Sequence, residues 1–538
     1  MIQNCRHIEI RTMVAEKLRT RIGWGPCVLR DCVLDHWVLL GVLICFLITT
    51  QADAAERPNV LLIVSEDNGP ELACYGDPYA RTPNLDRLAS EGVRFENAFV
   101  PYSVCSPSRA AFLTGLYPHQ NGQIGLATHK FAMYQNDTPN IATWLKAAGY
   151  RTGLIGKLHV NPESAFPFDY RAIPAANFQR KQSVTEYAAA ASKFFDEAKG
   201  KPFFLSVNFP DAHLPFLRQA NGLPSHPLGA DDVQPMPWVG VDSPRLREQV
   251  ANYYNCLERL DTGVGLLLNR LADAGHRDDT IVIYFGDHGA QFPRGKGTVY
   301  EGGLRVPLIV RWPGQAKAAA VRRELVSTVD LVPTILAAAA INVPGELPGR
   351  PLQPLLRDKA SVIWRKYSYG LTTGSFPRAC FVQHSIRDQR FKLISSPRPE
   401  SENLDAGTYL DEQHQHFVVS GATAQEQAAA PPHVQQAFAR WSRPPRYELY
   451  DLQSDPHEWK NLADLPQYSA TLSRLTVALG DWQRQTRDPF VEQKHVDAYV
   501  TEQLSNLDLG YRKDKAFRWS YLDDFLTWRN RQLAIDRK

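Results

Sequence analysis

Apolar runs that alternate with helix-like segments from Asn59 to about Ala340 constrain the fold of this chain more than any other feature. Runs of this length without charges are typical of strands buried on both faces of a sheet. The runs are Val60–Val64, Thr152–Ile155, Phe203–Phe209 and Thr280–Phe285, and the helix-like segments are Thr82–Glu91, Ile141–Ala148 and Arg245–Ala274. The alternation predicts an α/β fold with a mainly parallel sheet and helices on both faces.

The pattern changes after an alanine-rich helix that begins near Asp330. A proline-rich stretch at 344–354 is typical of a linker, and shorter runs such as Phe391–Ile394 and Tyr447–Asp451 predict a small antiparallel sheet beyond it. We therefore predict a main domain over residues 55–360, a smaller C-terminal α+β domain over 361–490 and a helical tail over 491–538. An apolar content of 44% is enough for a large core.

The N-terminal segment predicts export. Residues 38–48 form an apolar stretch too short to cross a bilayer, and small residues follow at Ala52–Ala54. We interpret residues 1–54 as a signal peptide with a long leader, which predicts a secreted or periplasmic protein with no membrane span after cleavage. A retained signal anchor is the alternative.

Cysteine content and charge exclude two classes of protein. Four of the eight cysteines follow the predicted signal, at positions 74, 105, 256 and 380. These are too few and too scattered for a disulfide framework, so stability must come from the core. A net charge of +3 over 538 residues is close to neutral, which argues against a nucleic-acid partner.

The segment Cys105–Gly115 reads CSPSRAAFLTG. Taken alone, it fits a buried cysteine that enters a helix with Pro107 in the first turn. A cysteine hydrolase is a further alternative, but the local signatures of those families are absent around Cys105. The segment resembles the site at which type I sulfatases have a cysteine oxidised to formylglycine, and this resemblance implies a formylglycine-generating enzyme as a partner during maturation.

A second segment, Gly149–His159 (GYRTGLIGKLH), resembles the other signature of type I sulfatases nearly position for position. Physically, it is a buried strand that ends at a glycine and places Lys157 and His159 at the C-terminal edge of the sheet, where open α/β sheets bind ligands. The resemblance extends over roughly residues 57–490. It implies an alkaline-phosphatase-like fold and an enzyme that hydrolyses sulfuric esters or sulfamates.

Two other predicted strands end in acidic turns. Glu66 and Asp67 follow one, and Asp287 and His288 follow the other, so both turns should meet at one edge of the sheet. The resemblance implies a divalent metal held by these four residues and by an oxygen of modified Cys105. The family usually carries Asp-Asp and Asp-Asn here, so Glu66 and His288 are departures. The oxygen-rich set favours Ca²⁺, the imidazole leans toward Mn²⁺, and Mg²⁺ is also compatible. Two acidic turns solvated at the surface are the alternative.

The resemblance also implies a role for each remaining candidate. His213 would be the acid for the leaving group, Lys296 would grip the sulfate, and Arg294 is close enough in sequence to share that task. The hydrated aldehyde at Cys105 would offer one oxygen to attack sulfur and a second hydroxyl whose deprotonation expels sulfate.

Four residues would support that cycle. Arg109 and Lys157 would hold the diol and its alkoxide as fixed cations, and Asp287 would help to remove the attacking proton. His159 would act last, as the base that takes the proton of the remaining hydroxyl.

Within the family, four motifs most resemble the N-sulfoglucosamine sulfohydrolases, or heparan N-sulfatases: Gly156–Glu163, Phe166–Asp169, His119–Gly122 and Thr486–Phe490. The predicted function is hydrolysis of sulfate from a sulfated carbohydrate, with N-sulfoglucosamine as the substrate. Three alternatives stay open: an exo-acting O-sulfatase on another sulfated polysaccharide, a phosphodiesterase or phosphonate hydrolase of the same superfamily, and an inactive glycan-binding protein.

Two other features have no assigned role. Arg378, His384 and Arg387 lie after the linker and either reach over the site or serve the surface or the core. The tail from Tyr511 to Lys538 is basic with interleaved aromatic residues. It fits a packed terminal helix or a homo-oligomer contact better than a platform for glycans.

Overall fold

Two β-sheets organise the computed structural model, which describes residues 57–536 except 175–176, 179, 199, 358–361 and 411–418. The predicted signal in residues 1–54 therefore lies outside the described residues. The larger sheet has the strand order β4-β3-β5-β1-β6-β7-β2-β8, and β9 pairs with β2. Its strands are β1 (Asn59–Ser65), β2 (Val93–Phe99), β3 (Arg151–Gly156), β4 (Tyr170–Ala172), β5 (Phe203–Phe209), β6 (Thr280–Gly286), β7 (Arg305–Arg311), β8 (Ala320–Arg322) and β9 (Val326–Ser327).

Strand pairing in the larger sheet is mainly parallel, as predicted. Strands β4, β3, β5, β1 and β6 are parallel to one another, and β7 is antiparallel to both β6 and β2. In the register of β1, Ser65 lies beside Phe209 of β5 and Gly286 of β6. The loops that follow these three strands therefore leave the sheet at the same level.

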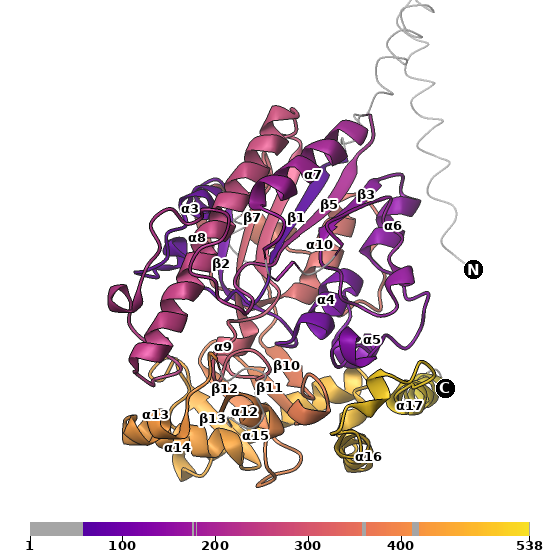
Figure 1. The fold of residues 1–538 in the computed structure, drawn as a ribbon. Helices are drawn as coiled ribbons and strands as arrows, with labels where there is room; N and C mark the ends of the chain where they lie inside the picture. The colour runs from indigo at the N-terminus through magenta and orange to yellow at the C-terminus, as the bar shows by residue number, and fades with distance from the viewer. Residues whose placement is uncertain are drawn as a thin grey trace, which may run out of the picture. The chain divides into compact units, whose positions relative to one another are not determined.

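Helices cover both faces of this sheet (Figure 1). One group contains α3 (Pro83–Ser90), α7 (Val184–Glu197) and α8 (Pro244–Asp273), and the other contains α4 (Cys105–Thr114), α6 (Ile141–Ala147) and α10 (Leu331–Ala338). Side-chain caps fix two of the starts, since Ser183 accepts from the amide of Glu186 at α7, and Ser243 accepts from that of Leu246 at α8. The predicted fold class is confirmed.

The smaller sheet is antiparallel, with the order β10-β11-β12-β13. Helix α15 (Ser469–Gln485) packs against β11 and β12. The strands are β10 (Ser368–Thr372), β11 (Gln383–Arg387), β12 (Phe391–Ser395) and β13 (Tyr447–Asp451). The other helices are α5 (Pro118–Asn121), α9 (Glu301–Leu304), α11 (Gln353–Leu356), α12 (Leu404–Leu410), α13 (Ala424–Ala429), α14 (Pro432–Ser442), α16 (Gln493–Leu504) and α17 (Tyr521–Asp536). The domain boundaries near 360 and 490 stay predictions.

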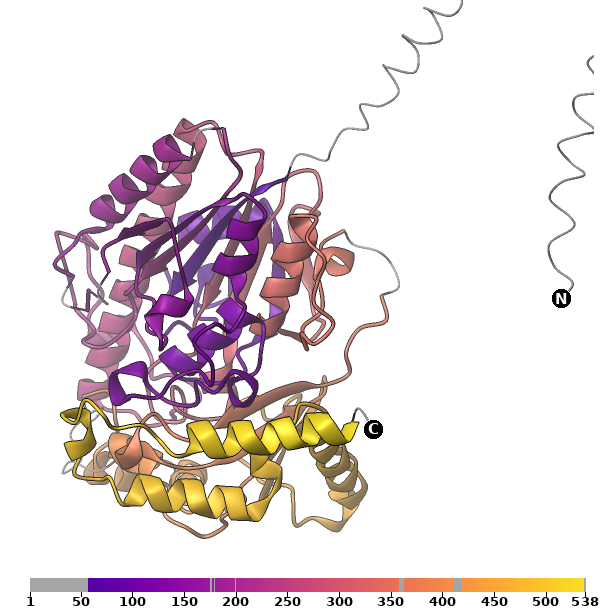
Figure 2. The ribbon, with the colours of Figure 1, turned by 90° about the vertical axis from the view of Figure 1, so that its right-hand side faces the viewer.

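The aromatic residues of the C-terminal tail pack onto the rest of the chain. Helix α17, yellow in Figure 2, runs across the lower half of the molecule in that view. The Trp519 ring stacks on Phe131 with 5.1 Å between centroids, and the Tyr521 hydroxyl donates to the carbonyl of Gly122 at 3.0 Å. Both Trp519 and Tyr521 are buried. These rings serve the core, as a packed terminal helix requires.

The four cysteines in the described part of the chain, at positions 74, 105, 256 and 380, are free. None of the described helices combines the length and the apolar character needed to cross a bilayer.

Asp405, on α12, is a carboxylic acid buried without compensation. Neither carboxylate oxygen has a hydrogen-bond partner among the described residues. The group lies against Gly297, where an added Cβ would come within 2.6 Å of Oδ1. Burial raises the pKa of Asp405 to about 8. The unfolded chain ionises this group near its ordinary value of 3.8, so the folded state loses stability as the pH rises from that value toward 8.

We expect Asp405→Asn to raise the midpoint of thermal unfolding at about pH 7.5 and to raise it less, or lower it, at about pH 4, where the wild-type group is neutral in the folded state and still about two-fifths neutral in the unfolded state. Circular dichroism at both pH values measures the difference. Asp464→Asn, at an exposed position, is the matched control. An equal shift at both pH values would contradict a buried neutral carboxyl at 405.

Candidate active site

The acidic turns after β1 and β6 are joined directly to each other. The amide of Asp287 donates to the carbonyl of Ser65 at 2.9 Å, and the amide of Asp67 donates to Asp287 Oδ1 at 3.0 Å. Glu66, Asp67, Asp287 and His288 are all buried. The parallel register of β1 and β6 thus brings residues about 220 positions apart into one cluster, as the two acidic turns predict.

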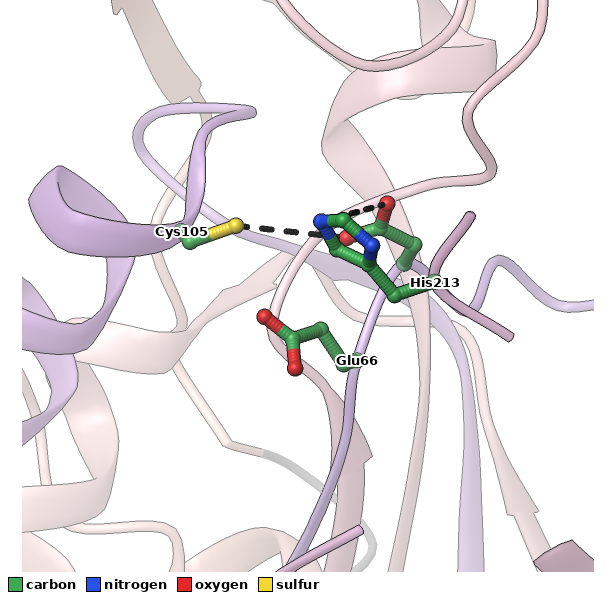
Figure 3. Close-up of side chains that lie close together, drawn as sticks. Glu66, Cys105 and His213 are labelled. Carbon is green, nitrogen blue, oxygen red and sulfur yellow. Dashed lines mark hydrogen bonds and ion pairs between the residues drawn. The ribbon is translucent and has the colours of Figure 1, made fainter. Parts of the chain in front are cut away.

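Cys105 is the first residue of α4 and lies inside this cluster. Its thiol is buried, 3.3 Å from His288 Nε2 and 4.0 Å from Asp67 Oδ1. Figure 3 shows the Cys105 side chain pointing toward the space between Glu66 and His213. The amides at the start of α4 give this position a positive electrostatic potential that favours negative charge.

The cluster has the composition of a metal site. Ligand atoms of Glu66, Asp67, Cys105 and His213 lie within 4.8 Å of one another, and so do those of Cys105, Asp287 and His288. Glu66 Oε2 is buried and has no hydrogen-bond partner in the described part of the chain. A buried carboxylate oxygen without a partner is costly unless a cation binds it, so these residues fit a divalent metal. The predicted ligands are brought together, and His213 lies beside them.

His288 presents one specific nitrogen to the cluster. Its Nδ1 lies 2.9 Å from the carbonyl of Gly289 and donates to it, which leaves Nε2 facing Asp67 Oδ1 at 3.1 Å. This tautomer suits a histidine that binds a metal through Nε2. Burial itself lowers the pKa of His288, but the carboxylates of Asp287 and Asp67 outweigh burial and raise it to about 9. A metal that binds at Nε2 would therefore displace a proton from that nitrogen.

Three cationic side chains surround the carboxylates. Arg109 Nη2 pairs with Asp287 Oδ2 at 3.0 Å, Lys296 Nζ pairs with Asp67 Oδ2 at 2.8 Å, and Lys157 pairs with Glu66. All of these groups are buried. Burial lowers the pKa of Lys296, but the Asp67 carboxylate more than compensates and the net shift is upward. Burial lowers the pKa of Arg109 as well, but the net shift is upward, mainly because of the Asp287 carboxylate, so both Arg109 and Lys296 keep their charge.

The two candidate histidines differ in their contacts. His159 has a left-handed backbone with φ of 58°, and neither ring nitrogen has a partner among the described residues. His213 donates from Nδ1 to the carbonyl of Leu214 at 2.6 Å and stacks on Phe178 at 3.9 Å. Burial, followed by the charge of nearby lysines, holds both pKa values well below the ordinary range. Both rings are neutral at pH 7.

A pocket of about 330 Å³ opens onto Cys105. Its lining contains five of the seven predicted catalytic residues: Cys105, Lys157, His159, His213 and Lys296. Arg109 and Asp287 lie outside this lining and contact the lining residues or the metal cluster. The structure thus collects all seven around one cavity.

Arg294 does not share the task of Lys296. Its guanidinium donates to the carbonyls of Trp238 at 3.0 Å and of Glu458 at 2.8 Å. It lies over the rings of Tyr300 and Trp459, with each ring centroid 4.5 Å from Cζ. The expectation from sequence proximity is wrong, because these contacts hold the side chain outside the lining of the pocket.

The three candidates beyond the linker do not line the pocket either. His384 Nε2 pairs with Asp488 Oδ2 at 2.7 Å, and Arg387 pairs with Glu301 at 2.6 Å, both in buried positions. Arg378 donates to a backbone carbonyl of the C-terminal segment at 2.7 Å. These three residues therefore have structural roles.

Several residues that support the site were not predicted. Asn208 Oδ1 accepts from Arg109 at 2.9 Å, Gln291 accepts from Lys296 at 3.2 Å, and the Tyr409 hydroxyl donates to the backbone carbonyl of Lys296 at 3.0 Å. An asparagine inside the mostly apolar run Phe203–Phe209 was the available signal for the first of these. Neither Gln291 nor Tyr409 has a comparable signal.

Two of the motifs that resemble N-sulfoglucosamine sulfohydrolases contact each other. His119 Nε2 lies 2.9 Å from Thr486 Oγ1, although the two residues are 367 positions apart. The motifs His119–Gly122 and Thr486–Phe490 therefore join the C-terminal part of the chain to the segment after α4. Neither lies in the lining of the Cys105 pocket.

Comparison with known families gives two matches. Residues 58–341 match the sulfatase family, and residues 286–406 match a family described as the C-terminal part of N-sulphoglucosamine sulphohydrolase. Human N-sulphoglucosamine sulphohydrolase is 32% identical over 505 residues, which cover 86% of this chain and 96% of the human protein. An ulvan-active sulfatase from Formosa agariphila is 30% identical, with 81% of each chain covered.

Solved structures share the fold. A structure bound to its substrate D-glucosamine-2-N,6-O-disulfate has a TM-score of 0.61 at 22% identity and covers 80% of this chain and 99% of its own. A phosphonate monoester hydrolase from Silicibacter pomeroyi has a TM-score of 0.58 at 20% identity and covers 80% of this chain and 96% of its own.

We expect Ca²⁺ to raise the unfolding midpoint of protein that has been treated with a chelator, because binding to the folded state alone adds about 2.7 kcal/mol at 100 times Kd. Asp67→Asn should remove most of this increase. Differential scanning calorimetry with Ca²⁺, Mn²⁺ and Mg²⁺ in parallel measures it and ranks the metals. Asp261→Asn, which alters a buried carboxylate bonded to Asn84 and Leu85, is the control and should keep the increase. Wild-type protein that gains nothing from any of the three ions would rule out a metal at this cluster.

Proposed function

Because the chain belongs to the sulfatase family, we propose that it is a sulfohydrolase of sulfated sugars whose substrate is a terminal N-sulfoglucosamine of a heparan-type chain. The observation that carries the chemistry is the position of Cys105. Its side chain lies at the start of a helix, between the carboxylates of a metal cluster and three buried cations. A nucleophile, a cation site and a sulfate-binding group are thus assembled in one pocket.

The sulfamate preference rests on the similarity. The human relative named for N-sulphoglucosamine covers most of both chains, and the second matching family carries the same description. The Cys105 pocket, at about 330 Å³, lies near the lower end of the range of about 300–1,000 Å³ for ligand pockets. This size supports a single terminal sugar unit as the group that enters.

Two groups would complete the site. A formylglycine at position 105, once hydrated, supplies a hydroxyl nucleophile and a second hydroxyl that later expels sulfate. A divalent metal held by Glu66, Asp67, Asp287 and His288 supplies a positive charge that neutralises sulfate oxygens in the transition state. Calcium is the proposed ion, because oxygen ligands dominate this set.

The residues of the chain divide the remaining tasks. Arg109 is held by Asp287 and by the carbonyl of Lys157, so its charge is fixed beside residue 105. Lys296 lines the pocket and can bind a sulfate oxygen. His159 is neutral and its ring nitrogens have no partner among the described residues, which suits a base that accepts a hydroxyl proton.

His213 needs a proton before it can act as the acid for the leaving group. Its Nδ1 donates to Leu214, so a proton would be gained at Nε2, the atom 4.0 Å from Asp67 Oδ2. A sulfate group bound in the pocket adds negative charge near this ring and raises its pKa. We propose that His213 takes up a proton from solvent when the substrate binds.

An exo-acting O-sulfatase on another polysaccharide is the second candidate. The ulvan-active sulfatases support it, because they are 30% and 28% identical to this chain, nearly as much as the human sulfohydrolase at 32%. The likeness to a phosphonate hydrolase extends to the fold alone. We also propose export from the cytoplasm, on the strength of the apolar segment at 38–48.

Cys105→Ala should abolish turnover, because no other side chain can replace the aldehyde, while the unfolding midpoint stays close to that of the wild type. Mass spectrometry of the peptide that contains residue 105 should find the wild-type chain lighter than its sequence, since a CH₂–SH group becomes an aldehyde. Full activity in the variant, or an unmodified thiol in a fully active preparation, would refute covalent catalysis by residue 105.

Lys296→Ala should lower kcat/KM by about 10²–10³-fold if the ammonium stabilises charge on sulfate. Lys193→Ala, on the exposed side of α7, is the matched loss of one lysine and should leave the rate unchanged.

Assays of N-sulfoglucosamine, an O-sulfated glucosamine and a phosphate diester in parallel decide the substrate. A rate on the O-sulfated sugar that exceeds the rate on the sulfamate would favour the second candidate.

A further inference from the structure

A second and larger pocket lies away from Cys105. It has a volume of about 550 Å³ and shares no lining residue with the first pocket. Its walls come from the segment after α4, from residues 345–350, from the start of β10 and from the end of α15. Cys105 begins α4 and Thr114 ends it, so the ten residues of this helix separate the two ends by about 15 Å.

Basic side chains dominate the charge of this second pocket. Arg350, Arg365, Lys366 and Arg487 line it, and Glu346 is the one acidic residue in the lining. Arg365 is paired with a buried aspartate, Asp330. Arg350 and Lys366 are exposed, and neither has a carboxylate partner in the described part of the chain. The pocket therefore presents more positive than negative charge to solvent.

Aromatic rings form another part of the wall. Tyr117, Tyr367, Tyr369 and Trp482 all line the pocket. Tyr369 stacks parallel on Trp482, with 4.6 Å between centroids and 4° between planes, and Tyr117 meets Trp482 edge to face at 5.1 Å. Rings packed in this way cannot turn freely, so they offer a fixed apolar surface with polar hydroxyls at its edge.

Positive charge beside fixed aromatic surface selects a particular class of ligand. A sugar ring has an apolar C–H face that packs on tyrosine and tryptophan. A sulfate substituent presents pairs of oxygens, which arginine can bind through two N–H groups at once. A volume of about 550 Å³ lies well inside the range of about 300–1,000 Å³ for ligand pockets. A neutral sugar would not pair with the cations, and a small anion would not pack on the rings.

We propose that this pocket is a second, non-catalytic binding site for sulfated carbohydrate. Its existence follows from the charges and rings above, whereas the choice of sulfate over other anionic substituents rests on the proposed function. Gln120, Thr486 and Arg487 line it and belong to the two motifs that contact each other outside the catalytic pocket. The site thus gives a role to motifs that catalysis does not use.

The test measures binding without turnover. In the full-length Cys105→Ala protein loaded with Ca²⁺, isothermal titration calorimetry with a heparin-derived octasaccharide should detect two sites. Arg350→Ala/Lys366→Ala should remove one site or weaken it by about tenfold or more, because two solvent-facing cations are lost. Lys193→Ala/Lys201→Ala removes the same charge from exposed positions on and just after α7 and should keep both sites. A fully desulfated octasaccharide should bind the second site at least about tenfold more weakly than the sulfated one.

Further arms separate the possible failures. With Cys105 intact, Arg350→Ala/Lys366→Ala should hydrolyse monomeric N-sulfoglucosamine at the wild-type rate. If no form of the protein, wild type included, hydrolyses this sugar, the proposed function is wrong. The binding measurement still tests the second site in that case. Lys366→Glu alone should weaken the octasaccharide at the second site, which covers the case of a double variant that does not fold. Unchanged binding in both variants, or an equal loss in the control, would overturn the proposal. Tighter binding of a single-stranded oligonucleotide than of the octasaccharide would also overturn it.

Discussion

The parallel register of β1 between β5 and β6 is the constraint on which the rest of the site depends. It places Ser65, Phe209 and Gly286 side by side, so the turns that follow these strands must share one edge of the sheet. The hydrogen bond from the amide of Asp67 to Asp287 then fixes one turn against the other. A slip of one residue in this register would turn each acidic side chain to the opposite face and disperse the cluster. Helix α4 completes the arrangement by bringing Cys105 to the same edge.

Charge balance explains why so many ionic groups can be buried together. Glu66, Asp67 and Asp287 would each be costly in isolation, and Arg109, Lys157 and Lys296 each pair with one of them. Such a network is rigid, because moving any member away from its partner leaves a buried charge unpaired, which is costly. The same rigidity serves catalysis, since cations that are already oriented need no reorganisation when charge develops on sulfate. The neutral histidines at 159 and 213 are then the groups beside the pocket that have a ring nitrogen free of a proton.

Much of this could be predicted from the sequence, for identifiable physical reasons. Apolar runs bounded by Gly and acidic residues located β1, β3, β5 and β6, because strands buried on both faces cannot carry charges. Two long motifs located Cys105, Lys157 and His159. The antiparallel direction of β7 was not predicted, since an apolar run carries no information on direction. Arg294 was misplaced because neighbours in a loop can point to different partners, and Tyr409 was missed because only the tertiary fold brings α12 to the backbone of Lys296.

A crystal structure of the mature protein grown with Ca²⁺ tests the central claim most directly, which is that residue 105 works beside a bound cation. The account predicts anomalous density at the cluster, with oxygens of Glu66, Asp67, Asp287 and the modified residue 105 at about 2.3–2.6 Å from the ion. It also predicts density for an aldehyde or its hydrate, and none for sulfur, at position 105. A thiol at that position in an active crystal, or a cation bound elsewhere with the cluster held by its own lysines, would contradict the account.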